Sequence, residues 1–160
     1  MGDKLLVGKV CFGPREDYDN LLSKTRHWAN IIPKVFICIR LRPKSEDPIR
    51  AKREFENNLE RAKIAARYAA LNGYDPEATT IYFTQFLNDF NEVERDLGRK
   101  IVQSRLYACN EIWMITDKGE VPSSGMISDL TFAVENDIQM VGKDFAEIKK
   151  WVENYDKASH

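Results

Sequence analysis

The sequence predicts an α/β domain, a three-layer sandwich in which helices cover both faces of a mainly parallel sheet of four to five strands. Segments with strand-like and helix-like patterns alternate along most of the chain, which is typical of βαβ units. The strand-like segments are short and continuously apolar, as expected for strands covered on both faces. The chain has 160 residues, of which 43% are hydrophobic, and this is enough for one domain with a sizeable core.

The first 33 residues are expected to form an N-terminal extension, followed by the α/β domain at residues 34–160. An apolar stretch at residues 5–12 predicts an edge strand or a hairpin, which Gly13-Pro14 ends. Residues 17–32 have the apolar spacing of a helix.

Four segments of the domain are expected to be strands, because each is apolar and is bounded by polar or turn-forming residues. They span residues 35–39, 79–83, 112–115 and 138–141. Helices are expected between and after them, where apolar residues recur with a period of about 3.6. They span residues 48–71, 91–107, 126–136 and 144–155. This alternation predicts a Rossmann or flavodoxin-like fold.

Local signals support the helix ends. Pro48 suits the opening turn of its helix, and Asn72-Gly73 suits the end, since glycine accepts the left-handed conformation of a C-terminal cap. Asn91 is expected to cap the next helix, with Glu94 three residues later in a variant of the capping box. Lys118-Gly119 predicts a turn.

Composition excludes several classes of function. The net charge of −1 gives no general attraction to nucleic acid or to an anionic membrane. No apolar run is long enough to span a bilayer and no leader is visible, so we expect a soluble cytoplasmic protein. The three cysteines form no Cys-x-x-Cys pair and are expected to be buried free thiols. Only two histidines are present, which argues against a zinc site or a Ser-His-Asp triad.

Ligands of such sheets bind beyond the carboxyl ends of the strands, so the residues that follow each strand are the candidates. Arg40 and Arg42 follow the first strand and suit a phosphate or carboxylate; the alternative is a solvated basic surface. Gln85 and Asp89 follow the second strand and are expected to hydrogen-bond a base or sugar; the alternative is that Asn88 and Asp89 merely form a turn.

The stretch after the third strand carries the most information. Ser123 or Ser124 is expected to cap the next helix and to contact a ligand, while Gly125 allows a close approach to the backbone. The free amide groups there, that of Met126 included, suit a phosphate or a sugar oxygen. Asp129, one turn later, faces the ligand or merely favours the helix dipole.

These residues resemble a known family. The stretch Ser123-x-Gly125-x-x-x-Asp129-Leu130-x-x-Ala133 resembles the S-x-G-x-x-x-E-L-x-x-A motif of the nucleoside 2-deoxyribosyltransferase-like superfamily, which includes the 2′-deoxynucleoside 5′-monophosphate N-glycosidases. Residues 109–115 resemble the family's preceding strand, and residues 36–43, with Cys38, resemble its ligand-contacting first strand and loop. Residues 82–89, followed by Glu94-Arg95 and Gly98, look most like an uncharacterised phage and bacterial branch. The resemblance covers residues 35–141.

The resemblance implies cleavage or transfer at the N-glycosidic bond of a nucleotide or nucleoside, through a carboxylate that attacks the anomeric carbon. The nucleophile falls on Asp129, where the family has the longer glutamate. The resemblance implies no metal or organic cofactor. It does imply a homodimer or a larger homo-oligomer. Asp89 and Asp117 are candidates for a second acid by loop position alone.

This chain departs from the family pattern at Ile39 and Arg40, where the family has small residues, and at Asn110, where an acidic residue is common. The aspartate in place of glutamate, the arginines of the first loop and the lack of a second acid placed by motif favour an alternative, in which the same pocket binds a nucleotide without turning it over, as a sensor or sequestering protein. A third possibility is an interaction domain whose N-terminal extension mediates assembly.

Overall fold

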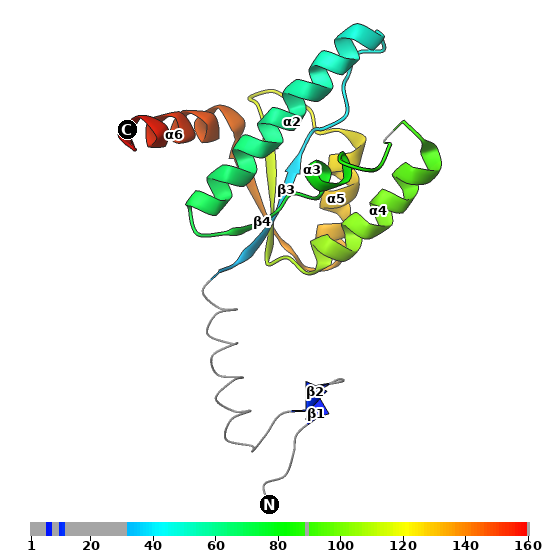
Figure 1. Ribbon diagram of the computed structural model, residues 1–160, viewed down its shortest axis with the longest axis vertical. Helices are drawn as coiled ribbons and strands as arrows, with labels where there is room; N and C mark the ends of the chain where they lie inside the picture. The colour runs from blue at the N-terminus through cyan, green and yellow to red at the C-terminus, as the bar shows by residue number, and fades with distance from the viewer. Residues whose placement is uncertain (1–5, 8–9, 12–31, 89, 160) are drawn as a thin grey trace, which may run out of the picture. The chain divides into compact units, whose positions relative to one another are not determined.

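The computed structural model describes residues 6–7, 10–11, 32–88 and 90–159, and the chain divides into two units, Met1–Pro33 and Lys34–His160 (Figure 1). In the first unit, strand β1 (Leu6–Val7) pairs with strand β2 (Val10–Cys11) in an antiparallel hairpin. The helix expected at residues 17–32 falls almost wholly outside the described residues.

The second unit is built on a four-stranded sheet of strands that all run parallel. The strands are β3 (Lys34–Ile39), β4 (Asp75–Glu77), β5 (Glu111–Thr116) and β6 (Gln139–Asp144), in the spatial order β4-β3-β5-β6. The chain passes from β3 to one neighbour and then returns to the other side of β3. The strand order therefore reverses between β3 and β5, where α/β sheets form their ligand-binding crevice.

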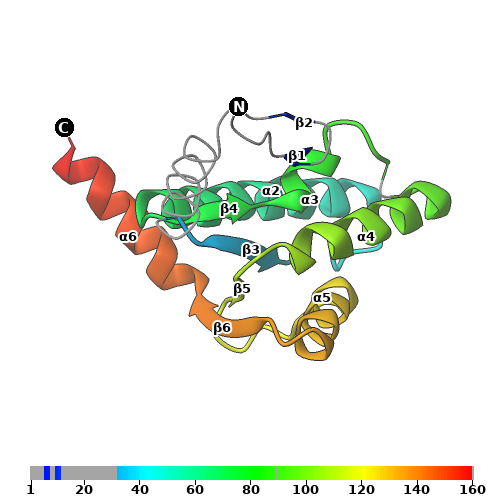
Figure 2. The same cartoon turned by 90° about the horizontal axis from the view of Figure 1, so that it is seen from below.

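Helices cover both faces of this sheet. Five are described in this unit: α2 (Pro48–Leu71), α3 (Thr79–Phe83), α4 (Glu92–Tyr107), α5 (Ser124–Glu135) and α6 (Phe145–Ala158). Helices α2 and α6 pack on one face, and α4 and α5 pack on the other (Figure 2). The predicted three-layer, Rossmann or flavodoxin-like α/β fold is thereby confirmed.

The core has two halves because side chains of a strand alternate between the faces of the sheet. Val35, Ile37 and Ile39 of β3 pack under α2 and α6, whereas Phe36 and Cys38 pack under α4 and α5. All five are buried. The continuous apolar run that predicted this strand is therefore the direct consequence of burial on both faces.

One strand prediction is wrong. Residues 79–83 form helix α3, and the strand of this region is the short β4 just before it. Strand β4 contains Pro76, which is tolerated because β4 lies at the edge of the sheet. The aromatic side chains of α3 pack on α4 instead of lying in the sheet: the guanidinium of Arg105 stacks 4.7 Å from the ring centroid of Tyr82.

The helix caps largely follow the sequence signals. The Asn91 side chain accepts hydrogen bonds from the amides of Val93 (3.0 Å) and Glu94 (3.2 Å), as predicted. The carboxylate of Glu94, however, accepts from the amide of Asn88 (2.7 Å), so it holds the preceding loop and does not complete a capping box. Among the described helices, none has both the length and the apolar composition needed to cross a bilayer.

Candidate functional site

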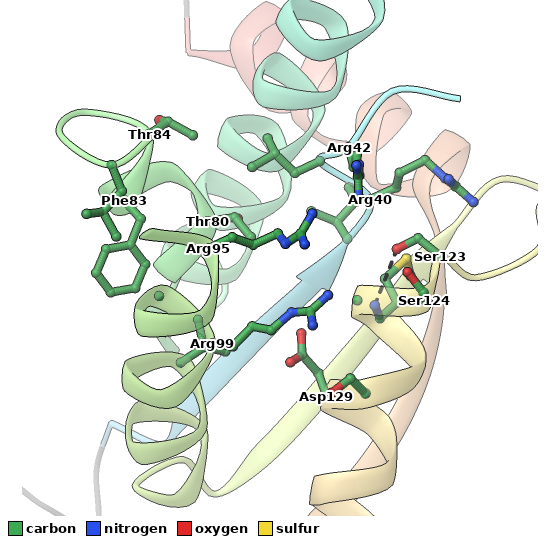
Figure 3. Close-up of a pocket in the computed structure, with 18 of the residues that line it drawn as sticks. Arg40, Arg42, Thr80, Phe83, Thr84, Arg95, Arg99, Ser123, Ser124 and Asp129 are labelled. Carbon is green, nitrogen blue, oxygen red and sulfur yellow. Dashed lines mark hydrogen bonds between the residues drawn. The ribbon is translucent and has the colours of Figure 1, made fainter. Parts of the chain in front are cut away.

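A cavity of about 370 Å³ lies at the carboxyl ends of β3 and β5, in the size range of small-molecule sites. It is lined by the loop after β3, by α3 and the loop after it, by α4, and by the first turns of α5 (Figure 3). The cavity thus lies at the point where the strand order reverses, where the sequence placed the site.

The N-terminus of α5 forms one wall of the cavity. Ser123 is the N-cap, and its side chain accepts a hydrogen bond from the amide of Met126 (3.3 Å). Ser123, Ser124, Gly125 and Met126 all line the cavity, so the structure brings these four predicted residues together. A Cβ atom at Gly125 would meet only the Ser123 Oγ at 3.9 Å, which means that the fold itself does not require glycine there.

Asp129 lies one turn further along α5 and also lines the cavity. Burial raises the pKa of its carboxyl group to about 7, and the positive charge of Arg99 acts in the opposite direction. Figure 3 shows the Asp129 carboxylate and the Arg99 guanidinium pointing toward one another across the cavity. Near neutral pH this carboxyl group is therefore divided between its protonated and ionised forms.

The two arginines after β3 have different environments. The strand ends at Ile39, and the guanidinium of Arg40 is bound to Glu120 Oε1 (3.2 Å) and to the carbonyl of Val121 (2.7 Å). Arg42 is exposed and lines the cavity without a hydrogen bond or ion pair to any described residue. Both arginines thus line the cavity, but the charge of Arg40 is already paired.

Three predicted residues do not reach the cavity wall. Cys38 is buried, its thiol lies 3.9 Å from the carbonyl of Met126, and burial raises the pKa of that thiol far above its ordinary value. Gln85 is exposed and donates to the Thr84 hydroxyl (3.2 Å). Asp117 pairs with Arg61 (3.0 Å) in a separate depression, so it is not placed to serve as a second acid.

Asp89 lies outside the described residues. Its neighbours Asn88 and Phe90 both line the cavity.

Sequence reasoning missed the residues that α3 and α4 contribute. Thr80, Arg95 and Arg99 line the cavity, and Figure 3 shows both arginines reaching from α4 toward the space beside α5. The sequence candidates were residues that directly follow strands, whereas α4 begins well after β4. The available signal was the spacing of Arg95 and Arg99, four residues apart on one face of a predicted helix.

Within the part of the chain that the structure describes, no cluster of three or more histidine, cysteine or acidic side chains is placed to hold a metal ion. The lining offers arginine, hydroxyl and amide donors together with the carboxyl groups of Glu94 and Asp129, which is a set of groups for an anionic or polar organic ligand.

No curated protein and no solved structure matches this chain. One family model does match, over residues 33–142, which is more than half of the chain and includes β3 to α5 and every described residue of the cavity lining. The chain therefore belongs to the family described as a domain of unknown function, DUF7768.

Proposed function

We propose that the protein processes a nucleotide or nucleoside, cleaving or transferring at the N-glycosidic bond with Asp129 as the nucleophile. The observation that carries this proposal is the position of Asp129: its carboxyl group lines a ligand-sized cavity at the strand-order reversal, beside the N-terminus of α5. The fold and the motif around Asp129 are those that the resemblance to the deoxyribosyltransferase-like superfamily implies.

The chemistry proceeds in two steps. The ionised carboxylate of Asp129 attacks the anomeric carbon, the C–N bond breaks, and the base leaves with the electron pair and takes up a proton. Water or a second base then attacks the same carbon, which breaks the ester and restores the carboxylate. Arg99 supports the first step, because its positive charge favours the ionised form of Asp129.

Other parts of the lining bind the substrate. The amides at the start of α5 and the hydroxyl groups of Ser123 and Ser124 suit a sugar or phosphate oxygen. The apolar side chains of Leu41, Leu87 and Val102 offer a surface for the flat face of a base.

A second candidate function is nucleotide binding without turnover. The pKa of about 7 at Asp129 favours it, since a protonated carboxyl group donates a hydrogen bond to a ligand but is a poor nucleophile. In this case the protein acts as a sensor or sequesters its ligand, and affinity survives the loss of the carboxylate charge.

The deciding experiment is chromatography of nucleosides and nucleotides after incubation with the wild type, with Asp129→Asn and with a matched control. Glu135→Gln is that control, because Glu135 lies exposed at the far end of the same helix. Release of free base by the wild type and by Glu135→Gln, but not by Asp129→Asn, establishes the chemistry. Retention of a compound by all three proteins with no base release overturns it and leaves the binding function.

A further inference from the structure

We propose that Arg95 and Arg99 of α4, together with Thr80 of α3, form a phosphate-binding subsite, so that the ligand of the cavity is a phosphate monoester. The inference rests on the proposed function for the nucleotide part of the ligand, whereas the subsite itself depends on the side chains of the cavity alone. It stands on the wall opposite the N-terminus of α5 and adds a second set of anion-binding groups to the cavity.

Two polar atoms of this subsite are buried without a hydrogen-bond partner. They are the Nε of Arg95 and the Oγ1 of Thr80, and both residues line the cavity. Polar groups that folding removes from water are nearly always hydrogen-bonded. Of the three unpaired buried side-chain atoms in the described part of the chain, the third being Arg61 Nε, two belong to residues that line this one cavity, which points to a ligand that supplies the acceptors. A phosphate oxygen accepts from both a guanidinium and a hydroxyl.

The arrangement of charge points the same way. Arg95 and Arg99 lie four residues apart on one helix face, where two like charges destabilise a helix unless an anion lies near both. Arg40, Arg61, Arg67 and Arg105 each pair with a carboxylate.

Arg95 and Arg99, by contrast, make no ion pair or hydrogen bond within the described part of the chain. The cavity therefore holds two guanidinium groups of α4 that have no hydrogen bond or ion pair there, and Asp129 is the carboxylate that Arg99 faces. A dianionic phosphate would neutralise both arginines.

The position of Arg99 relates this subsite to Asp129. Arg99 faces the Asp129 carboxylate (Figure 3). A phosphate held by Arg95 and Arg99 therefore places the attached sugar on the Asp129 side of the cavity. The groups at the start of α5 are then left for the sugar hydroxyls or the base.

The test is calorimetric titration of the full chain with deoxynucleosides, with their 5′- and 3′-monophosphates and with inorganic phosphate. The proteins are the wild type, Arg95→Gln, Arg99→Gln and, as a matched control, Arg53→Gln. Arg53 lies exposed on α2, away from the cavity lining. Arg95→Lys is a further variant that keeps the charge but loses the planar fork.

We expect the wild type and Arg53→Gln to bind one class of monophosphate at least about tenfold more tightly than the nucleoside, because hydrogen bonds to a charged group are strong. Arg95→Gln and Arg99→Gln should each weaken monophosphate binding by about 10- to 100-fold and leave nucleoside binding unchanged. Arg95→Lys should recover part of the affinity.

Equal binding of nucleosides and monophosphates, no binding of any probe, or no effect of the two glutamine variants overturns the subsite. Inorganic phosphate that binds as tightly as any monophosphate overturns the assignment to a phosphate ester. The proposed glycosidic chemistry fails separately: monophosphate binding that needs both arginines but gives no base release supports the subsite and rejects the enzyme. Base release from nucleosides, with no tighter binding of the monophosphates, supports the enzyme and rejects the subsite.

Discussion

The carboxyl group of Asp129 and the guanidinium of Arg99 face one another across the cavity, one from α5 and the other from α4. Burial raises the pKa of Asp129 to about 7, while Arg99 lowers it. Burial and the charge of Arg99 together decide whether Asp129 is ionised at a given pH, and so whether it is able to act as a nucleophile. Because the pKa of Asp129 is shifted, its protonation can be followed through the pH dependence of stability and by NMR titration, without any knowledge of the ligand.

The free energy of unfolding should fall as the pH rises, because the folded protein binds a proton at Asp129. Its folded pKa of about 7 is above the ordinary value of 3.8, so the folded chain holds a proton that the unfolded chain releases in this range. The contribution to the free energy of unfolding is therefore present at acid pH and is lost as the pH rises through about 7.

Asp129→Asn removes this dependence, and urea unfolding of both proteins at pH 5 and pH 8 measures it. We expect the wild type to lose roughly 2 to 3 kcal/mol relative to the variant between these two pH values. A stability difference that is the same at both pH values would contradict the raised pKa.

Removal of the Arg99 charge should raise the pKa of Asp129 further, because the attraction that favours the ionised carboxylate is lost. A carboxyl-carbon NMR titration of the wild type and of Arg99→Gln measures this directly. Arg99→Lys keeps the charge and should titrate close to the wild type. A titration midpoint that Arg99→Gln leaves unmoved would show that the two groups are not coupled.

Ser123→Ala should lower the free energy of unfolding by about 1 kcal/mol, since the side chain caps the N-terminus of α5. Ser124→Ala is the matched control. Ser124 is exposed in the first turn of α5, so its loss should change the stability by less than about 0.5 kcal/mol. Equal effects of the two substitutions in urea unfolding would argue against Ser123 as the cap.

Glu120 should be important for the stability of the loop that follows β5. Its carboxylate accepts from Arg40 (3.2 Å), from Arg61 (3.1 Å) and from the amide of Asp117 (2.8 Å). Burial tends to raise the pKa of Glu120, but these hydrogen bonds and charges outweigh it and hold the pKa below its usual range. The stabilisation is therefore present at neutral pH and is lost as the pH falls through that lowered pKa.

Glu120→Gln should cost about 1 to 3 kcal/mol in urea unfolding at neutral pH, because charged hydrogen bonds are lost. Glu60→Gln is the comparison, since the exposed Glu60–Lys63 pair should contribute no more than about 1 kcal/mol. A loss that is no larger at Glu120 than at Glu60 would show that the loop does not depend on this cluster.

The sequence by itself determined the features that depend on local pattern. The apolar run of β3 predicted a doubly covered strand, and the polar side chain of Asn91 predicted a helix cap, because both signals act over a few neighbouring residues. The place of Ser123 and Asp129 at the carboxyl edge of the sheet, where the cavity lies, also followed from the sequence, since residues that follow a parallel strand lie at that edge.

Local pattern gave the wrong prediction where a strand and a short helix have the same apolar sequence pattern. Residues 79–83 are apolar and aromatic enough for a strand, and a run of five residues does not separate a strand from one turn and a half of helix. The choice was made by packing against α4, where Arg105 stacks on Tyr82.

Only the tertiary structure decided which charged groups meet. It paired the predicted anion ligand Arg40 with Glu120, and it brought Arg95 and Arg99 of α4 to the cavity beside Asp129. Electrostatic interactions and desolvation depend on distance in space and on burial, and neither quantity is written in the spacing of residues along the chain.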